Sequence, residues 1–177
     1  TRAQAEIAAG TPERHRAVPA PDLPPHPVAD AAPFRADPAA ALGALADLLD
    51  GADRVLAAVA AALPGASPVR VWPHHFDMAT LAPIAPERTL GAGLAVPDAL
   101  EPDGYWYVSP WAASPPVASD PDWPALAHGR WVDRGALRMA VLPLGAWAGL
   151  ADAGARAAAL AGFLHDACTS AISNLRR

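Results

Sequence analysis

The sequence predicts an α+β domain in which a mainly antiparallel sheet of about five or six strands is covered by two long helices, with Pro-rich straps. Two observations predict this class. Apolar residues recur at helical spacing near both ends of residues 37–177, and Pro and Gly divide the stretch between them into short segments rich in β-branched and aromatic residues. The 177-residue length suits a single domain of this kind, which we place at 37–177 after an N-terminal segment at 1–36.

The N-terminal segment contains a Pro-rich stretch at residues 18–33. Its six prolines exclude a helix or a central strand and favour an extended, polyproline-like chain. Such a chain could be a linker, but Leu23, Val28 and Phe34 provide apolar anchors along it. We therefore expect an ordered strap against the domain surface.

The first long helix is expected to begin with Asp37 as its N-cap and Pro38 at the first helical position. Its apolar residues alternate spacings of three and four, which forms one continuous stripe, and Pro64-Gly65 ends it. The stripe consists of Leu42, Leu45, Leu49, Ala52, Leu56, Val59 and Leu63. Packing on the domain's own sheet is the usual role of such a stripe, and a homodimer through it is left open.

The middle of the chain reads as strands, and the clearest is Gly104 to Val108, with three aromatic residues in succession. Between the fourth and fifth strands, residues 112–127 are expected to form a packed, Pro-rich surface loop. A second long helix is expected over 152–175, capped by Asp152. The expected strands lie near 68–72, 75–81, 88–95, 104–109, 130–133 and 136–142.

Composition excludes several classes of protein. The net charge of −5 and the lack of a basic stripe argue against nucleic-acid binding. No segment reaches the roughly 18 apolar residues of a membrane span. The single cysteine, Cys168, cannot form a disulfide within the chain, and it lies on the apolar face of the last predicted helix. We therefore expect a cytoplasmic protein with a buried, unreactive thiol.

The run from Val71 to Asp77 concentrates the residues that could carry chemistry. If 75–81 is a strand, His75 and Asp77 share one face and could bind a divalent metal or exchange protons. The metal candidates are His75, Asp77 and His128, with His74 and Asp98 as other choices for the third ligand. The alternative is structural: imidazoles and a carboxylate hydrogen-bonded at a strand junction that Pro73 marks.

Two further features accompany this run. Gly91 and Gly93 permit close approach of a ligand or a neighbouring strand, although a strand bend is the commoner role. Tyr105 and Tyr107 alternate along their strand, so they share a face on which one or both could line a cleft. The candidate pocket residues are Trp72, His74, His75, Asp77, Asp98 and Tyr107.

The stretch from Ser67 to Leu81 resembles the signature of a family of uncharacterised bacterial proteins defined by W-P-H-H-F-D. The similarity extends over residues 18–145 and includes Gly91-Ala92-Gly93, Asp98, 105–111 and 129–131. The resemblance implies no activity, because none is established for the family. It does imply that relatives are longer, with a β-rich section before the Pro-rich strap, so that this chain resembles their C-terminal portion. Relatives tend to carry His where this chain has Val132, and if that His is a metal ligand in them, its absence argues against a metal site here.

Two functions are consistent with these patterns. The first is a small-molecule-binding protein with its pocket at the W-P-H-H-F-D signature, including an enzyme that uses His–Asp acid–base chemistry. The second is a non-catalytic structural or protein-interaction domain whose His and Asp residues stabilise the fold. The environment of His75 and Asp77 distinguishes them: a shared ligand site favours the first, and side chains bonded only within the protein favour the second.

Overall fold

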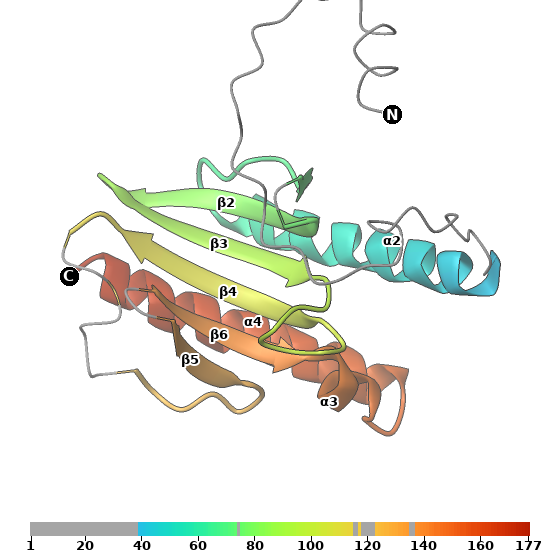
Figure 1. Ribbon diagram of the computed structural model, residues 1–177. Helices are drawn as coiled ribbons and strands as arrows, with labels where there is room; N and C mark the ends of the chain where they lie inside the picture. The colour runs from blue at the N-terminus through green and yellow to red at the C-terminus, as the bar shows by residue number, and fades with distance from the viewer. Residues whose placement is uncertain (1–38, 74, 115–116, 118–122, 135–136) are drawn as a thin grey trace, which may run out of the picture. The chain divides into compact units, whose positions relative to one another are not determined.

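The computed structural model describes residues 39–177, apart from residues 74, 115–116, 118–122 and 135–136 (Figure 1). The strap predicted at 18–33, the cap residues Asp37 and Pro38, and the candidate His74 lie outside the described residues. The elements are α2 (Ala39–Ala62), β1 (Arg70–Trp72), β2 (Asp77–Ala85), β3 (Arg88–Ala95), β4 (Tyr105–Ala112), β5 (Arg130–Arg134), β6 (Leu137–Pro143), α3 (Leu144–Ala148) and α4 (Ala153–Leu175).

The six strands form one antiparallel sheet in the order β1-β2-β3-β4-β6-β5, which confirms the α+β class. β3 occupies the predicted residues, whereas β2 begins two residues later than predicted and continues to Ala85. The described chain has three helices and not the two predicted. The additional one is the short helix α3, which follows Pro143.

The ends of the long helices follow local rules. α2 ends at Ala62, and Gly65 then adopts a φ of 75°, a left-handed conformation that glycine enters without a steric cost. The Asp152 side chain accepts a hydrogen bond of 2.8 Å from the Ala155 amide, as its predicted capping role requires. No helix in the described part of the chain is both long and apolar enough to cross a membrane.

The main core lies between the helices and one face of the sheet. Leu56 of α2 and Leu164 of α4 belong to the same buried cluster as Leu90 of β3 and Val108 of β4. In Figure 1 both long helices lie behind the sheet, on the same side of it. Cys168 of α4 packs against this cluster, and burial raises the pKa of its thiol to about 11, which leaves little reactive thiolate at neutral pH.

The opposite face of the sheet carries no helix among the described residues (Figure 1). Residues that alternate with the core positions point to it, including Asp77 of β2, Gly93 of β3 and Tyr107 of β4. A smaller buried cluster, which contains Tyr105 and Val141, also lies on this face. We call it the helix-free face.

The apolar stripe of α2 is core only in part, because Leu56 is 0% exposed but Leu42 is 56% exposed. We expect Leu56→Ala, and equally Leu164→Ala on α4, to lower the free energy of unfolding by about 2–5 kcal/mol through lost contacts and a cavity. Denaturant titration measures this, and Leu42→Ala is the matched control, expected to change it by less than about 0.5 kcal/mol. A similar loss for all three variants would contradict this description of the core.

Candidate functional site

The W-P-H-H-F-D run forms the turn between β1 and β2. The carbonyl of Trp72 accepts hydrogen bonds from the amides of Phe76, at 2.7 Å, and His75, at 3.4 Å. Phe76 adopts a φ of 55°, and β2 begins only at the following residue. The predicted strand over 75–81 is therefore wrong at its start, and the alternation argument that placed His75 and Asp77 on one face does not apply.

His75 and Asp77 occupy different environments. His75 lies in the turn and its side chain is exposed, whereas Asp77 is the first residue of β2 and only 8% exposed. Trp72, a third candidate from the same run, pairs directly with Asp77 across the two strands and is half-buried. The turn thus separates an exposed imidazole from a buried carboxylate.

Asp77 is joined to a second candidate residue, Tyr107. The Tyr107 hydroxyl donates a hydrogen bond to Oδ2 of Asp77, although the two residues come from β2 and β4, with β3 between them. The ring can reach across because its partner on β3 is Gly93. A Cβ at Gly93 would lie 2.7 Å from Cζ and the hydroxyl oxygen of Tyr107 and 2.7 Å from the carbonyl oxygen of Met78. Glycine is needed here for close approach, not for a strand bend.

The second carboxylate oxygen of Asp77 has no such partner. Oδ1 is buried and receives no hydrogen bond from the residues that the structure describes. A buried polar atom in this state costs about 1–3 kcal/mol, and more where the group is charged. Three other buried atoms of the described chain share this state, Nε1 of Trp106, Nε1 of Trp123 and Oδ1 of Asn174, and Asp77 is the one carboxylate among the four.

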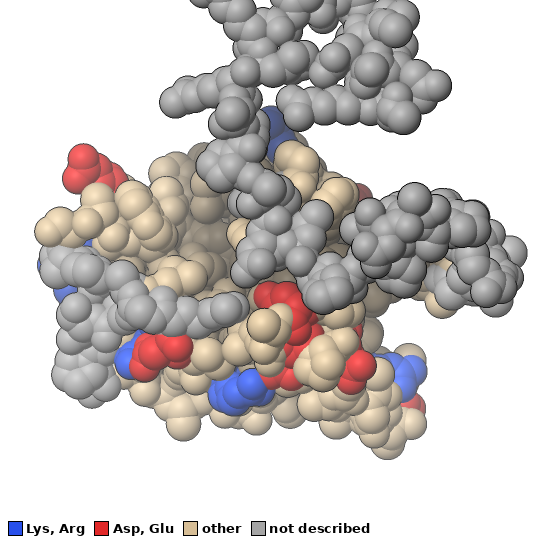
Figure 2. All heavy atoms as spheres, in the orientation of Figure 1, with Lys and Arg blue, Asp and Glu red and all other residues tan. Residues whose placement is uncertain are grey.

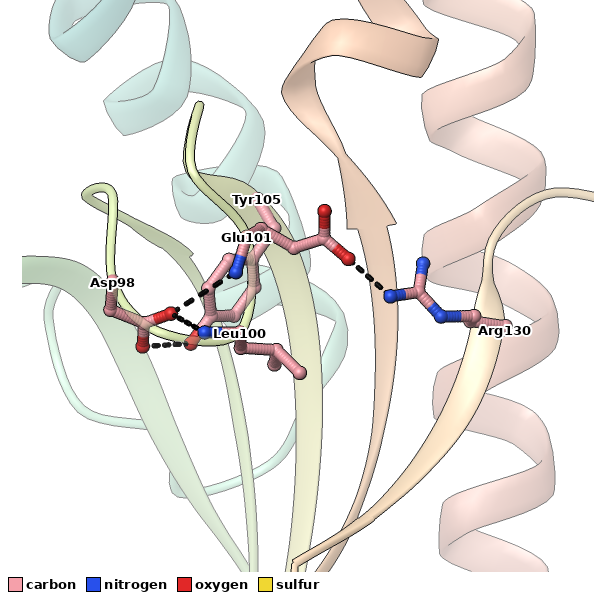
Figure 3. Close-up of polar contacts among 5 residues, drawn as sticks. All are labelled: Asp98, Leu100, Glu101, Tyr105 and Arg130. Carbon is pink, nitrogen blue, oxygen red and sulfur yellow. Dashed lines mark hydrogen bonds and ion pairs between the residues drawn. The ribbon is translucent and has the colours of Figure 1, made fainter.

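Asp98 bonds the neighbouring Tyr105 and, unlike Asp77, has a hydrogen-bond donor at each of its two carboxylate oxygens (Figure 3). Its Oδ1 accepts from the amides of Leu100, at 2.7 Å, and Glu101, at 3.3 Å, and its Oδ2 accepts from the Tyr105 hydroxyl at 2.9 Å. Glu101 in turn forms an ion pair with Arg130 of β5. Every acceptor of Asp98 is used within the protein, so Asp98 holds the loop before β4 in place.

The electrostatics of Tyr107 favour its role as a donor. Burial, together with the hydrogen bond to Asp77 and the charge of that carboxylate, raises the pKa of Tyr107 far above its ordinary value of 10.0. The phenol therefore stays protonated throughout the physiological range. Tyr105 lies beside it, with the ring centroids 6.2 Å apart and the planes tilted by 59°.

The metal candidates do not assemble within the described residues, where no three His, Cys, Asp or Glu side chains gather to hold an ion. His128 is exposed, and its Cδ2 atom would lie 3.6 Å from a methyl group added at Gly162 of α4. That position borders the helix-covered face, whereas Asp77 points to the helix-free face. His75 is exposed in the turn.

Two features of this site escaped sequence reasoning. The first is the left-handed Phe76, which no local signal indicates, because a bulky residue rarely adopts that conformation. The second is the pairing of Asp98 with Tyr105. Part of this could have been found, because an Asp that bonds the amides two and three residues onward is a common turn device.

The chain matched no family model, and neither the curated proteins nor the solved structures searched contained a match.

The contact between Tyr107 and Gly93 yields a paired prediction. We expect Gly93→Ala to lower the free energy of unfolding by about 1–3 kcal/mol, because the new methyl group collides with the Tyr107 ring and a backbone oxygen. Gly91→Ala, on the same strand and face, places its methyl group in ordinary contact at 3.7–3.9 Å and should be nearly neutral. Thermal and denaturant unfolding of both variants test this, and equal effects would contradict it.

The raised pKa of Tyr107 makes its hydrogen bond sensitive to alkaline pH. Because the folded-state pKa lies above the unfolded value of 10.0, the bond contributes its full stability below pH 10 and loses it as pH rises further. At neutral pH we expect Tyr107→Phe to cost about 1.5–3 kcal/mol. The difference in unfolding free energy between wild type and this variant should shrink above pH 10. A difference that is constant from pH 7 to pH 11 would contradict the assignment.

Proposed function

We propose that the protein binds a small molecule on the helix-free face, at Asp77 and Tyr107, and that Oδ1 of Asp77 accepts a hydrogen bond from that ligand. The observation that carries the proposal is the contrast between two carboxylates that each serve one tyrosine. Both oxygens of Asp98, an exposed residue, accept hydrogen bonds, whereas the buried Asp77 keeps one oxygen without a donor. A ligand N–H or O–H would remove the cost of that oxygen.

The site has properties that suit binding. Tyr107 holds Oδ2 and fixes the orientation of the carboxylate, so Oδ1 is presented in one direction. Asp77 also adjoins an exposed turn, in which Pro73, His75 and Phe76 are open to solvent, so a ligand would reach the buried Oδ1 by moving this turn aside. A fixed acceptor beside aromatic side chains is a common arrangement in small-molecule sites.

A second candidate function, a structural or protein-interaction domain, rests on a different observation. Tyr107 packs over Gly93 and bonds Asp77, which ties β4 to β2 across β3. This connection by itself would explain the Asp of the signature as a fold-stabilising residue. The two functions differ in what removal of Asp77 does to binding and to stability.

Asp77→Asn and Asp98→Asn form a matched pair of variants. We expect Asp77→Asn to abolish chemical-shift changes caused by small probes at the amides of Asp77, Gly93 and Tyr107, in two-dimensional NMR with a set of amines, guanidines, alcohols and carboxylates. Its unfolding free energy should change by less than about 1 kcal/mol, because the loss of a charged acceptor is offset by the loss of an unpartnered buried charge. Asp98→Asn should bind the same probes as wild type.

The opposite pattern supports the structural function. There, no probe shifts the amides around Asp77 in the wild type, and Asp77→Asn lowers the unfolding free energy by about 1–3 kcal/mol, the cost of a lost buried hydrogen bond. Probe binding that survives Asp77→Asn would place the ligand elsewhere and remove Asp77 from the site.

A further inference from the structure

Phe76 combines two features that each reduce stability. Its φ of 55° lies in the left-handed region, which costs a bulky residue of order 1–2 kcal/mol. Its side chain is also 70% exposed, so an aromatic ring stands in water next to the buried Asp77. Asn or Gly at this position would relieve the strain and remove the exposed apolar surface. Stability therefore does not explain why the turn carries Phe.

Glu87 provides the internal comparison. It is the other described residue besides glycine with a positive φ, also 55°, and it lies in the turn between β2 and β3. Its carbonyl oxygen accepts a 3.2 Å hydrogen bond from the Ala113 amide, and its charged side chain is suited to the solvent that surrounds it. The strain at Glu87 belongs to a tight turn alone, whereas Phe76 adds an exposed aromatic ring.

Asp77 has no ion-pair partner among the described residues. The described ion pairs join Arg54 to Asp50, Arg130 to Glu101 and Arg138 to Asp133, and none reaches Asp77. Tyr107 contributes a donor but no charge. A buried carboxylate in this situation is stabilised most by a cation that also donates a hydrogen bond.

The surroundings of Asp77 add to this preference. Met78 pairs with Leu94, so Asp77 lies at the end of the sheet where the loop between β3 and β4 begins. That loop contains Asp98, Glu101 and Asp103, and Figure 2 shows acidic atoms gathered over it. Glu101 is paired with Arg130, so the excess negative charge of this loop comes from Asp98 and Asp103, and it attracts a positively charged molecule.

We propose that the ligand is an organic cation, a primary ammonium group attached to an apolar group, and that Phe76 determines this specificity by contact. The proposal rests on the binding function proposed above. The ammonium group donates to Oδ1 of Asp77 and neutralises its charge. The ring of Phe76, on the adjacent residue, covers the apolar part of the ligand and attracts the cation through its face. This contact is what the strained, exposed conformation of Phe76 maintains.

The test uses the full 177-residue chain with two probes of the same shape, 2-phenylethylamine and neutral 2-phenylethanol. NMR titrations give the affinity of each for the wild type and for Phe76→Gly, Glu87→Gly and Asp77→Asn. We expect the amine to bind the wild type about tenfold more tightly than the alcohol, the difference of one charge-assisted hydrogen bond. Phe76→Gly should weaken amine binding about threefold or more, and Glu87→Gly should leave it unchanged.

Thermal unfolding distinguishes a lost contact from a damaged fold. Both glycine variants should unfold at or above the wild-type temperature, because glycine removes the strain at each position. If Phe76→Gly is less stable, Phe76→Asn, which tolerates the left-handed conformation, serves as the second variant. Weaker amine binding together with unchanged or greater stability supports the proposal.

Each contrary outcome contradicts a different part of the proposal that Asp77 and Phe76 bind an organic cation. Equal binding of amine and alcohol, lost in Asp77→Asn, removes the cationic specificity and leaves the binding function standing. The same holds where the amine fails to bind but another probe class shifts the amides around Asp77. Amine affinity that is unchanged in both Phe76→Gly and Phe76→Asn removes the contact by Phe76. Amine binding that persists in Asp77→Asn overturns this proposal and the proposed site together.

Discussion

The hydrogen bond from Tyr107 to Asp77 is the interaction on which the arrangement of the helix-free face depends. It joins β4 to β2 over the strand between them, and this is possible only because Gly93 leaves room for the ring. One consequence is a fixed register. A slip of β3 by one residue would place Ala92 or Leu94 beneath the Tyr107 ring, and either side chain would block the ring from reaching Asp77. Another is a fixed carboxylate, because the hydrogen bond from Tyr107 to Oδ2 holds the Asp77 side chain in one orientation.

The helix-covered face was largely predictable from the sequence because its signals are local. The division of the middle of the chain by Pro and Gly placed a strand at 88–95, which is β3, and the Asp152 cap with the apolar spacing over 152–175 predicted α4. These patterns depend on neighbours within a few residues, which a sequence displays directly. The same reasoning overestimated the core of α2, where Leu42 and Leu45 fit the stripe but remain exposed. A helical pattern shows which side is apolar and not how far along the helix the sheet extends.

The sequence predicted which residues belong to the candidate site but not which of them contact one another. Asp77, Asp98 and Tyr107 were all named from the sequence, yet their pairing depends on contacts between strands. Tyr107 and Asp77 are 30 positions apart, and Tyr105 and Asp98 are joined through a loop. Placing His75 and Asp77 together assumed a strand that begins at His75, but Phe76 is left-handed and the strand begins only at Asp77. A bulky residue in that conformation contradicts local preference, so tertiary structure or function has to maintain it.

Two locally unfavourable features of the described chain lie at successive residues, and others lie elsewhere: Glu87 is also left-handed, and Nε1 of Trp106, Nε1 of Trp123 and Oδ1 of Asn174 are also buried without a hydrogen-bond partner. Phe76 adds strain and exposed apolar surface, and Asp77 adds a buried oxygen without a donor. What distinguishes Phe76 and Asp77 is that a strained residue and an unpartnered buried oxygen are adjacent, at the start of β2. Asp98 differs in both respects, because it is exposed in the loop before β4 and both of its carboxylate oxygens accept hydrogen bonds. The buried Asp77 is satisfied at one oxygen only and follows a strained aromatic residue, which is the combination expected where stability is reduced in favour of binding.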